Sequence, residues 1–336
     1  MENKTTILLL LKDRPEFTKR WLHVHEMLNF QIPIHIADGS LAKKNEKIIS
    51  EFLKRNKRLK IDYKHYGKDI DLPTFYRKIT NAIKSINSQY VIFTCNDDFL
   101  IEKSIIEGAN FLENNKGYVA TAGPVYDTTM CQTKLEHTQI WGKLSHPINQ
   151  YPAFDRKEEL AESRIYNFLA GRKNSYIFMA LHRRDALLKT NEIIEQSCPP
   201  DLRLQEHLLS MMTLCFGKVS GAMPCMTFHQ NNPGESAGKD IIKKGTWYQW
   251  IQSKEWFDFY KKMISVLVEN ISESEYSTTD LKRRIEIYYQ AQIGQMNIRE
   301  FHPSYKSELF AKGDPMPTHG DLFNQLRNIR NIVENK

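Results

Sequence analysis

The stretch Tyr90-Val-Ile-Phe-Thr-Cys-Asn-Asp-Asp-Phe99 is the most informative part of the sequence, because a short apolar run ends there in three polar side chains. A strand that delivers Asn96, Asp97 and Asp98 at its carboxyl end places oxygen ligands where open α/β sheets bind their ligands. Such oxygen clusters hold Mg²⁺ or Mn²⁺, and these ions usually accompany phosphates. The alternative is a strand followed by an ordinary polar turn, because Asn and Asp are favoured turn residues. The surrounding segments decide between these two interpretations.

Strand-like and helix-like segments alternate on both sides of this stretch. Continuous apolar runs predict buried strands, and apolar residues at helical spacing predict helices. The expected strands are 5–11, 33–37, 61–65, 90–94 and 175–181, with 218–228 as a further candidate. The expected helices are 16–28, 43–58, 73–86, 101–114 and 202–214. This alternation predicts an α/β fold with a mostly parallel sheet and helices on both faces.

The ends of the predicted strands carry the candidate ligands. Right-handed crossovers place the carboxyl ends of parallel strands on one edge of the sheet. We therefore expect Lys12-Asp13-Arg14, Asp38 and Asn96-Asp97-Asp98 to converge there. A carboxylate after an early strand often holds a ribose or a base edge, although Asp38-Gly39 alone also fits a tight turn. Neither G-x-G-x-x-G nor G-x-x-x-x-G-K-[ST] is present, which disfavours a nicotinamide dinucleotide fold and a P-loop NTPase.

Beyond about residue 240 the sequence changes to apolar stripes at helical spacing. The stripes are Trp256, Tyr260, Met263, Ile264, Leu267 and Ile271; Leu281, Ile285, Tyr288 and Gln292; and Leu322, Leu326, Ile329 and Val333. We expect an α/β domain over residues 1–240 and an α-helical region over residues 241–336. The helical region would either pack as a lid over the site or dock on a membrane surface.

Composition describes an ordinary globular protein, with 41% hydrophobic and 26% charged residues. The net charge of +7 is mild and no nucleic-acid-binding motif accompanies it, so we expect no nucleic-acid partner. Five widely spaced cysteines without a C-x-x-C predict reduced thiols. The apolar runs are too short for a membrane span or a signal peptide. The expected location is cytoplasmic, with peripheral contact at the inner face of the cell membrane as an alternative.

Two downstream segments supply further candidates. A predicted helix begins at Asp201-Leu-Arg-Leu-Gln-Glu-His207, where a carboxylate or imidazole would serve as a general base. An acidic residue there is equally explained as compensation of the helix dipole. His229 follows an apolar run and would be a metal ligand, while Ser236 and Lys239 in the polar loop after it would contact phosphates. A single histidine is more often structural than ligating.

The order of these motifs resembles that of the GT-A glycosyltransferases, particularly family-2-like bacterial enzymes that build surface polysaccharides. Their first strand ends in a T-Y-N-R-P-like turn, which here reads Leu11-Lys-Asp-Arg-Pro-Glu16. Their second strand ends in a D-D-G-S-like turn, here Ala37-Asp-Gly-Ser40. A helix with an R-N pair, here Arg77 and Asn81, then leads to the D-x-D strand end.

The remaining motifs show two departures from that family. Asn96 stands in place of the first acid of D-x-D, while Asp98 stands at the position that coordinates metal. The E-D-like helix start reads Glu206-His207, which leaves the identity of the base open, and the late histidine is His229. The resemblance covers roughly residues 5–240.

The resemblance implies a nucleotide-sugar-binding catalytic domain that uses Mn²⁺ or Mg²⁺. The donor would be a nucleoside-diphosphate sugar, with a UDP-sugar favoured, and the acceptor a hydroxyl of a glycan or lipid-linked glycan, with inversion at the anomeric carbon. Implied donor contacts are Leu11, Arg14, Asp38, Arg77, Asn81, Asn96, Asp97 and Lys239. Implied metal ligands are Asp98 and His229, and Glu206 is the preferred base, with Asp201 and His207 in reserve.

Two other classes remain open at this stage. A nucleotidyltransferase uses a related sheet and a divalent metal, but it usually carries a glycine-rich basic loop after the first strand. Lys12-Asp13-Arg14-Pro15 contains no glycine. A non-catalytic nucleotide- or carbohydrate-binding subunit of a glycan synthase complex would tolerate the Asn96 and His207 departures.

Overall fold

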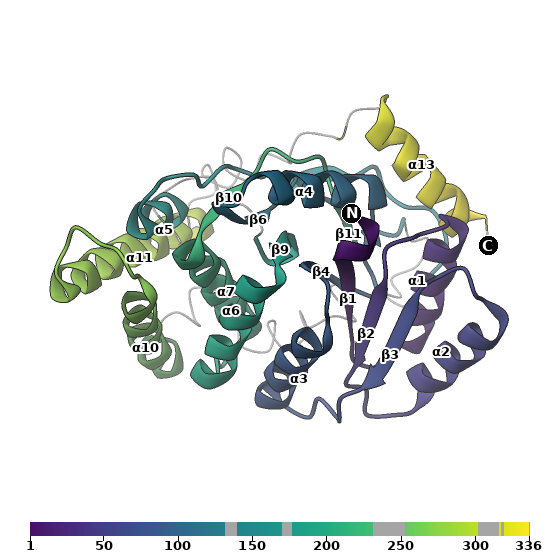
Figure 1. The fold of residues 1–336 in the computed structure, drawn as a ribbon, viewed down its shortest axis with the longest axis horizontal. Helices are drawn as coiled ribbons and strands as arrows, with labels where there is room; N and C mark the ends of the chain where they lie inside the picture. Colours follow the sequence, from purple (N-terminus) through teal and green to yellow (C-terminus); the bar gives the residue numbers. More distant parts are fainter. Residues whose placement is uncertain (132–139, 170–176, 231–252, 302–315, 317–318, 336) are drawn as a thin grey trace.

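The computed structural model describes residues 1–131, 140–169, 177–230, 253–301, 316 and 319–335 (Figure 1). Its centre is a seven-stranded sheet with the strand order β10-β6-β9-β4-β1-β2-β3. The strands are β1 (Thr5–Leu11), β2 (Ile34–Asp38), β3 (Ile61–His65), β4 (Tyr90–Cys95), β6 (Tyr118–Thr121), β9 (Leu181–Arg183) and β10 (Lys218–Ser220). The expected α/β architecture with a mainly parallel sheet is confirmed.

One strand of this sheet runs against the others. β9 pairs antiparallel with both β4 and β6, whereas the other neighbours in the sheet pair in parallel. The strand expected at 175–181 is displaced, because Ile177–Met179 form a 3₁₀ turn and the strand begins only at Leu181. The three apolar side chains of that turn are buried, so burial is satisfied there without a strand.

The central strand β1 is buried on both faces, and its side chains alternate between two cores. Leu8 and Leu10 belong to the core beneath α3 (Leu72–Ser85), α5 (Ala161–Leu169), α6 (Arg184–Ser197) and α7 (Leu202–Phe216). Ile7, Leu9 and Leu11 belong to the core beneath α1 (Pro15–Met27), α2 (Lys44–Arg55) and α4 (Glu102–Asn114). A continuous apolar run is what a parallel strand covered by helices on both faces requires.

A second, four-stranded sheet begins just after the carboxyl end of β4, because its strand β5 (Phe99–Leu100) follows the turn after β4. Its order is β5, β11 (Thr227–Gln230), β7 (Val125–Thr128) and β8 (Ile148–Tyr151). The candidate strand at 218–228 therefore divides between the two sheets, as β10 and β11. β5 and β11 pair antiparallel, with Leu100 opposite Thr227 and Phe99 opposite Phe228. One further step along that register brings Asp98 opposite His229.

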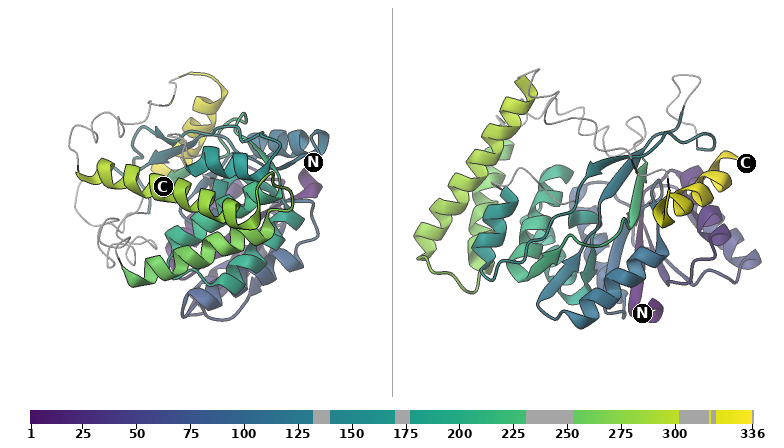
Figure 2. Two further views of the ribbon diagram at one scale, coloured as in Figure 1. Left: turned by 90° about the vertical axis from the view of Figure 1, so that its left-hand side faces the viewer. Right: turned by 90° about the horizontal axis from the view of Figure 1, so that it is seen from above.

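The described parts of the C-terminal region are helical, as expected, and these helices lie at two ends of the molecule (Figures 1 and 2). α10 (Lys254–Asn270) and α11 (Thr278–Phe301) share one hydrophobic core with α5 and α7, whereas α13 (Asp321–Glu334) packs near α1. The expected domain boundary at residue 240 lies outside the described residues and stays a prediction. Within the described part of the chain, no helix is long and apolar enough to cross a membrane.

The shared core predicts that α10 unfolds together with the sheet. Met263 on α10 is fully buried in the same cluster as Leu208 of α7. Met263→Ala should therefore lower the free energy of unfolding by about 2–5 kcal/mol, measured by urea denaturation followed by circular dichroism. Phe257→Ala on the same helix is the control, because that side chain is 49% exposed. A separate transition that alone responds to Met263→Ala would contradict a shared core.

Candidate functional site

The ends of β1 and β4 meet through an ion pair between Arg14 and Asp97. Both terminal nitrogens of Arg14 donate to Oδ2 of Asp97, at 3.0 Å each. Arg14 caps the start of α1 with a left-handed backbone (φ 54°, ψ 53°), and Asp13 before it is also left-handed (φ 56°). Left-handed non-glycine residues cost about 1–3 kcal/mol each and concentrate at functional sites. The expected convergence at the carboxyl edge is confirmed.

Two further side chains hold the turn after β4 in place. The Asn96 amide donates to the Arg14 carbonyl at 3.2 Å and to Thr18 Oγ1 at 3.1 Å, so it ties the turn to the start of α1. Arg20, which is fully buried, donates to the Asp97 carbonyl at 3.3 Å. Burial lowers the pKa of Arg20 to about 10, although the negative charge of Asp97 acts to raise it. Sequence reasoning missed Arg20, and no local pattern distinguishes it from a surface arginine on α1.

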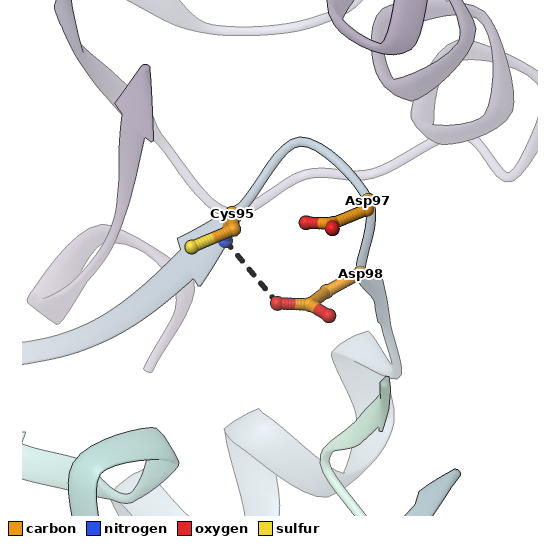
Figure 3. A group of neighbouring side chains, drawn as sticks. All are labelled: Cys95, Asp97 and Asp98. Carbon is orange, nitrogen blue, oxygen red and sulfur yellow. Dashed lines mark hydrogen bonds between the residues drawn. The ribbon is translucent and has the colours of Figure 1, made fainter. Parts of the chain in front are cut away.

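Asp98 and His229 form the central contact of the site. Nδ1 of His229 lies 2.8 Å from Oδ1 of Asp98. The backbone N–H of Cys95 donates to Oδ2 of Asp98 at 3.3 Å (Figure 3). Burial lowers the pKa of His229, but the charge and hydrogen bond of Asp98 and the charges of Asp127 and Asp97 outweigh it and raise the pKa to about 9. The pair therefore carries a proton at neutral pH, which a bound cation would displace.

Asp127 is a further carboxylate that sequence reasoning missed. It lies beside His229 in the parallel β7–β11 register. Burial raises the pKa of Asp127 to about 6, and its buried Oδ1 has no hydrogen-bond partner among the described residues. An aspartate inside a strand is unusual, and this feature of the sequence could have identified Asp127 as a candidate site residue. Its position opposite His229 depends on pairing between strands about 100 residues apart along the sequence.

The side chains at this edge fit a divalent cation. The potential ligand atoms of Cys95, Asp97 and Asp98 all lie within 4.8 Å of one another. His229 adds an imidazole nitrogen next to Asp98. Carboxylate oxygens and imidazole nitrogens are ligands of Mn²⁺, Fe²⁺ and Zn²⁺ sites. The sequence-predicted ligands Asp98 and His229 are thus brought together, and their role as metal ligands stays a prediction.

Asp38 lies at the expected edge, but its carboxylate is directed into the protein. Oδ1 accepts hydrogen bonds from the backbone N–H and hydroxyl of Ser40, and Oδ2 accepts one from the Tyr63 hydroxyl at 3.0 Å. The residue is 1% exposed. Asp38 therefore shapes the turn after β2, and its contact with a nucleotide stays a prediction.

The expected R-N pair on α3 does not reach the edge. Arg77 is exposed and lies 3.7 Å from Glu195 of α6, and Asn81 is exposed as well. The next residue, Lys78, is the one that turns inward, because adjacent helical residues differ in direction by about 100°. Lys78 lies in the same buried stripe as Ile79 and Ala82, and this pattern in the sequence could have identified it.

Lys78 connects the ends of β1, β2 and β3. Its ammonium donates to the Leu11 carbonyl at 2.9 Å and forms a buried ion pair with Asp69. The Gly39 N–H donates to the same Leu11 carbonyl, and the Asp69 carboxylate fills the space that a side chain at position 39 would need. Only glycine fits there. Leu11 thus lies at the edge as expected, with its carbonyl already hydrogen-bonded.

The three candidate bases on α7 differ in their surroundings. Asp201 caps the helix by accepting from the Arg203 N–H at 2.7 Å, and it also pairs with the Arg203 guanidinium. His207 lies between the rings of Phe168 and Tyr289, and burial lowers its pKa to about 4. Glu206 is half-buried. The roles of all three stay predictions, and Ser236 and Lys239 lie outside the described residues.

Comparison with known proteins identifies solved structures with a similar fold. No protein-family model and no curated protein matches the sequence. Among solved structures, S. aureus TarS 1–349 aligns over 98% of this chain and 81% of its own, with a TM-score of 0.50 and 12% identity. The same TarS segment in complex with UDP and with UDP-GlcNAc aligns with a TM-score of 0.51. A longer TarS structure matches over 46% of its length, with a TM-score of 0.52. This likeness shows a GT-A-type fold.

The Lys78–Asp69 pair predicts a strong thermodynamic coupling. Lys78→Met leaves a buried carboxylate without its partner and should lower the free energy of unfolding by about 3–5 kcal/mol. Adding Asp69→Asn should restore a large part of that loss. Lys84→Met on the same helix is the control, because Lys84 pairs with Glu192 at the surface and its loss should leave the midpoint nearly unchanged. Urea denaturation of the wild type, both single site variants, the double variant and the control measures the coupling, and additive effects of the two site variants would contradict it.

Proposed function

We propose that the protein is a metal-dependent glycosyltransferase. It would transfer a sugar from a nucleoside-diphosphate sugar, with a UDP-sugar favoured, to an acceptor hydroxyl in bacterial surface glycan biosynthesis. The observation that carries the proposal is the contact of Asp98 with His229 at the carboxyl edge of a GT-A-type sheet. The structures of TarS with UDP and UDP-GlcNAc support the choice of donor class, because the two proteins share their fold.

The donor-binding role would fall to the residues that converge at this edge. Arg14, held by Asp97, supplies a fixed positive charge suited to a diphosphate. The turns after β1 and β2, linked by Lys78, form the platform for the nucleoside. Asp98 and His229 would hold Mn²⁺ or Mg²⁺, which, when bound, offsets the charge that develops on the departing nucleoside diphosphate.

Proton transfer from the acceptor would fall to Glu206. Glu206 is a half-buried carboxylate near the start of α7, at the place of the E-D-like helix start of the family that the sequence resembles, whereas Asp201 caps that helix. A base on the face opposite the leaving group gives inversion at the anomeric carbon. The acceptor would be a glycan or a lipid-linked glycan reached from the cytoplasm, with peripheral contact at the inner membrane.

Loss of the metal-binding carboxylate tests the proposal directly. Asp98→Asn should reduce Mn²⁺-dependent hydrolysis or transfer of a UDP-sugar by more than the ~10–100-fold that loss of an outer-shell partner costs. The measurement is release of UDP with and without Mn²⁺. Asp258→Asn, a surface carboxylate on α10, is the matched control. Undiminished turnover by Asp98→Asn would contradict the metal assignment. UDP binding without any turnover by the wild type would favour a binding subunit.

The choice of base predicts different effects for two neighbouring variants. Glu206→Gln should lower kcat by about 10²–10⁴-fold with little change in donor KM. Asp201→Ala should instead lower the free energy of unfolding by about 1 kcal/mol, as loss of a helix cap does. Steady-state kinetics and thermal denaturation of both variants separate the roles. A stable Asp201→Ala protein without activity would reverse the assignment.

A further inference from the structure

The last residue of β4, Cys95, adds a sulfur atom to the cluster at the carboxyl edge (Figure 3). Its Sγ and the carboxylate oxygens of Asp97 and Asp98 lie within 4.8 Å of one another. Ligands bound tetrahedrally to one ion at bond lengths of about 2.0–2.3 Å lie roughly 3.3–3.8 Å apart. Small side-chain movements are therefore enough to bring the three atoms onto one cation.

Each member of the cluster keeps coordination capacity for a cation. Arg14 bonds only Oδ2 of Asp97, and the thiol of Cys95 forms no hydrogen bond with the described residues. Each oxygen of Asp98 carries one hydrogen bond, to His229 or to the Cys95 N–H, and so keeps a second lone pair. His229 supplies the fourth donor atom, since its Nδ1 lies 2.8 Å from Oδ1 of Asp98.

We propose that Cys95, Asp97, Asp98 and His229 form a mixed sulfur, oxygen and nitrogen site for a borderline divalent cation such as Zn²⁺ or Co²⁺. The inference rests on the proposed function, because it refines the cation of the same site. Mg²⁺ prefers oxygen ligands in octahedral geometry, whereas thiolate and imidazole ligands select softer ions. On binding, the Cys95 thiol loses its proton to solvent and its sulfur forms the bond to the cation.

A purely structural role for Cys95 makes a different prediction. A buried cysteine normally acts as a small apolar residue. Cys225 has that role just before β11 of the second sheet, where its thiol donates to the Thr227 carbonyl at 3.2 Å. Cys225→Ser is therefore the matched control for Cys95→Ser, since both exchange a buried or half-buried sulfur for oxygen.

Cobalt absorption spectroscopy tests the proposal on the full-length protein. Co²⁺ added to the wild type should give a near-ultraviolet sulfur-to-cobalt charge-transfer band together with the visible bands of bound Co²⁺. Cys95→Ser should lose the near-ultraviolet band and bind Co²⁺ at least ~10-fold more weakly, as even loss of an outer-shell partner does. Cys225→Ser should keep both features.

Alkylation of the wild type gives a second measurement that needs no variant. Zn²⁺ or Co²⁺ should protect Cys95 from iodoacetamide, with the exposed Cys131 and Cys198 as internal references, and peptide mass spectrometry reads each site. Visible Co²⁺ bands without the charge-transfer band, or unprotected Cys95 in the presence of bound Co²⁺, would overturn the thiolate inference and leave the Asp98–His229 site intact. Absence of any Co²⁺ or Mn²⁺ binding would contradict the metal-dependent function as well.

Discussion

The contact between Asp98 and His229 is the constraint on which the candidate site depends, because it joins the two sheets. Asp98 follows β4 of the large sheet, and His229 belongs to β11 of the small one. The antiparallel register of β5 and β11 sets them opposite each other. Two residues 131 positions apart are thus placed by backbone hydrogen bonding, so the site forms as part of the fold.

The surroundings of that contact explain how so many buried charges are tolerated. Asp97 is paired with Arg14, and Lys78 is paired with Asp69. Buried charges that lose a partner are costly, so these pairs tie the stability of the edge to its geometry. The turn after β4 is also fixed to α1 by Asn96. A preorganised edge of this kind loses little entropy when a charged ligand binds.

The sequence predicted the parts of the fold that depend on local patterns. β1 is a continuous apolar run buried on both faces, and acidic residues follow β4, so these strands and their ends could be predicted from the sequence. The sequence motif pointed to Arg77, but the inward-facing residue of α3 is its neighbour Lys78. Adjacent helical residues differ in direction by about 100°, so an error of one position selects the wrong face. The reversed β9 and the place of Asp127 depend on strand pairing between distant segments, which no local pattern encodes.

A crystal structure of the protein with UDP and Mn²⁺, analysed by anomalous scattering, would determine whether Asp98 and His229 hold a metal ion. We expect one Mn²⁺ in direct contact with Asp98 and His229, next to the diphosphate of UDP and Arg14. UDP bound at this edge without a metal ion, or Mn²⁺ coordinated elsewhere on the protein, would contradict this expectation.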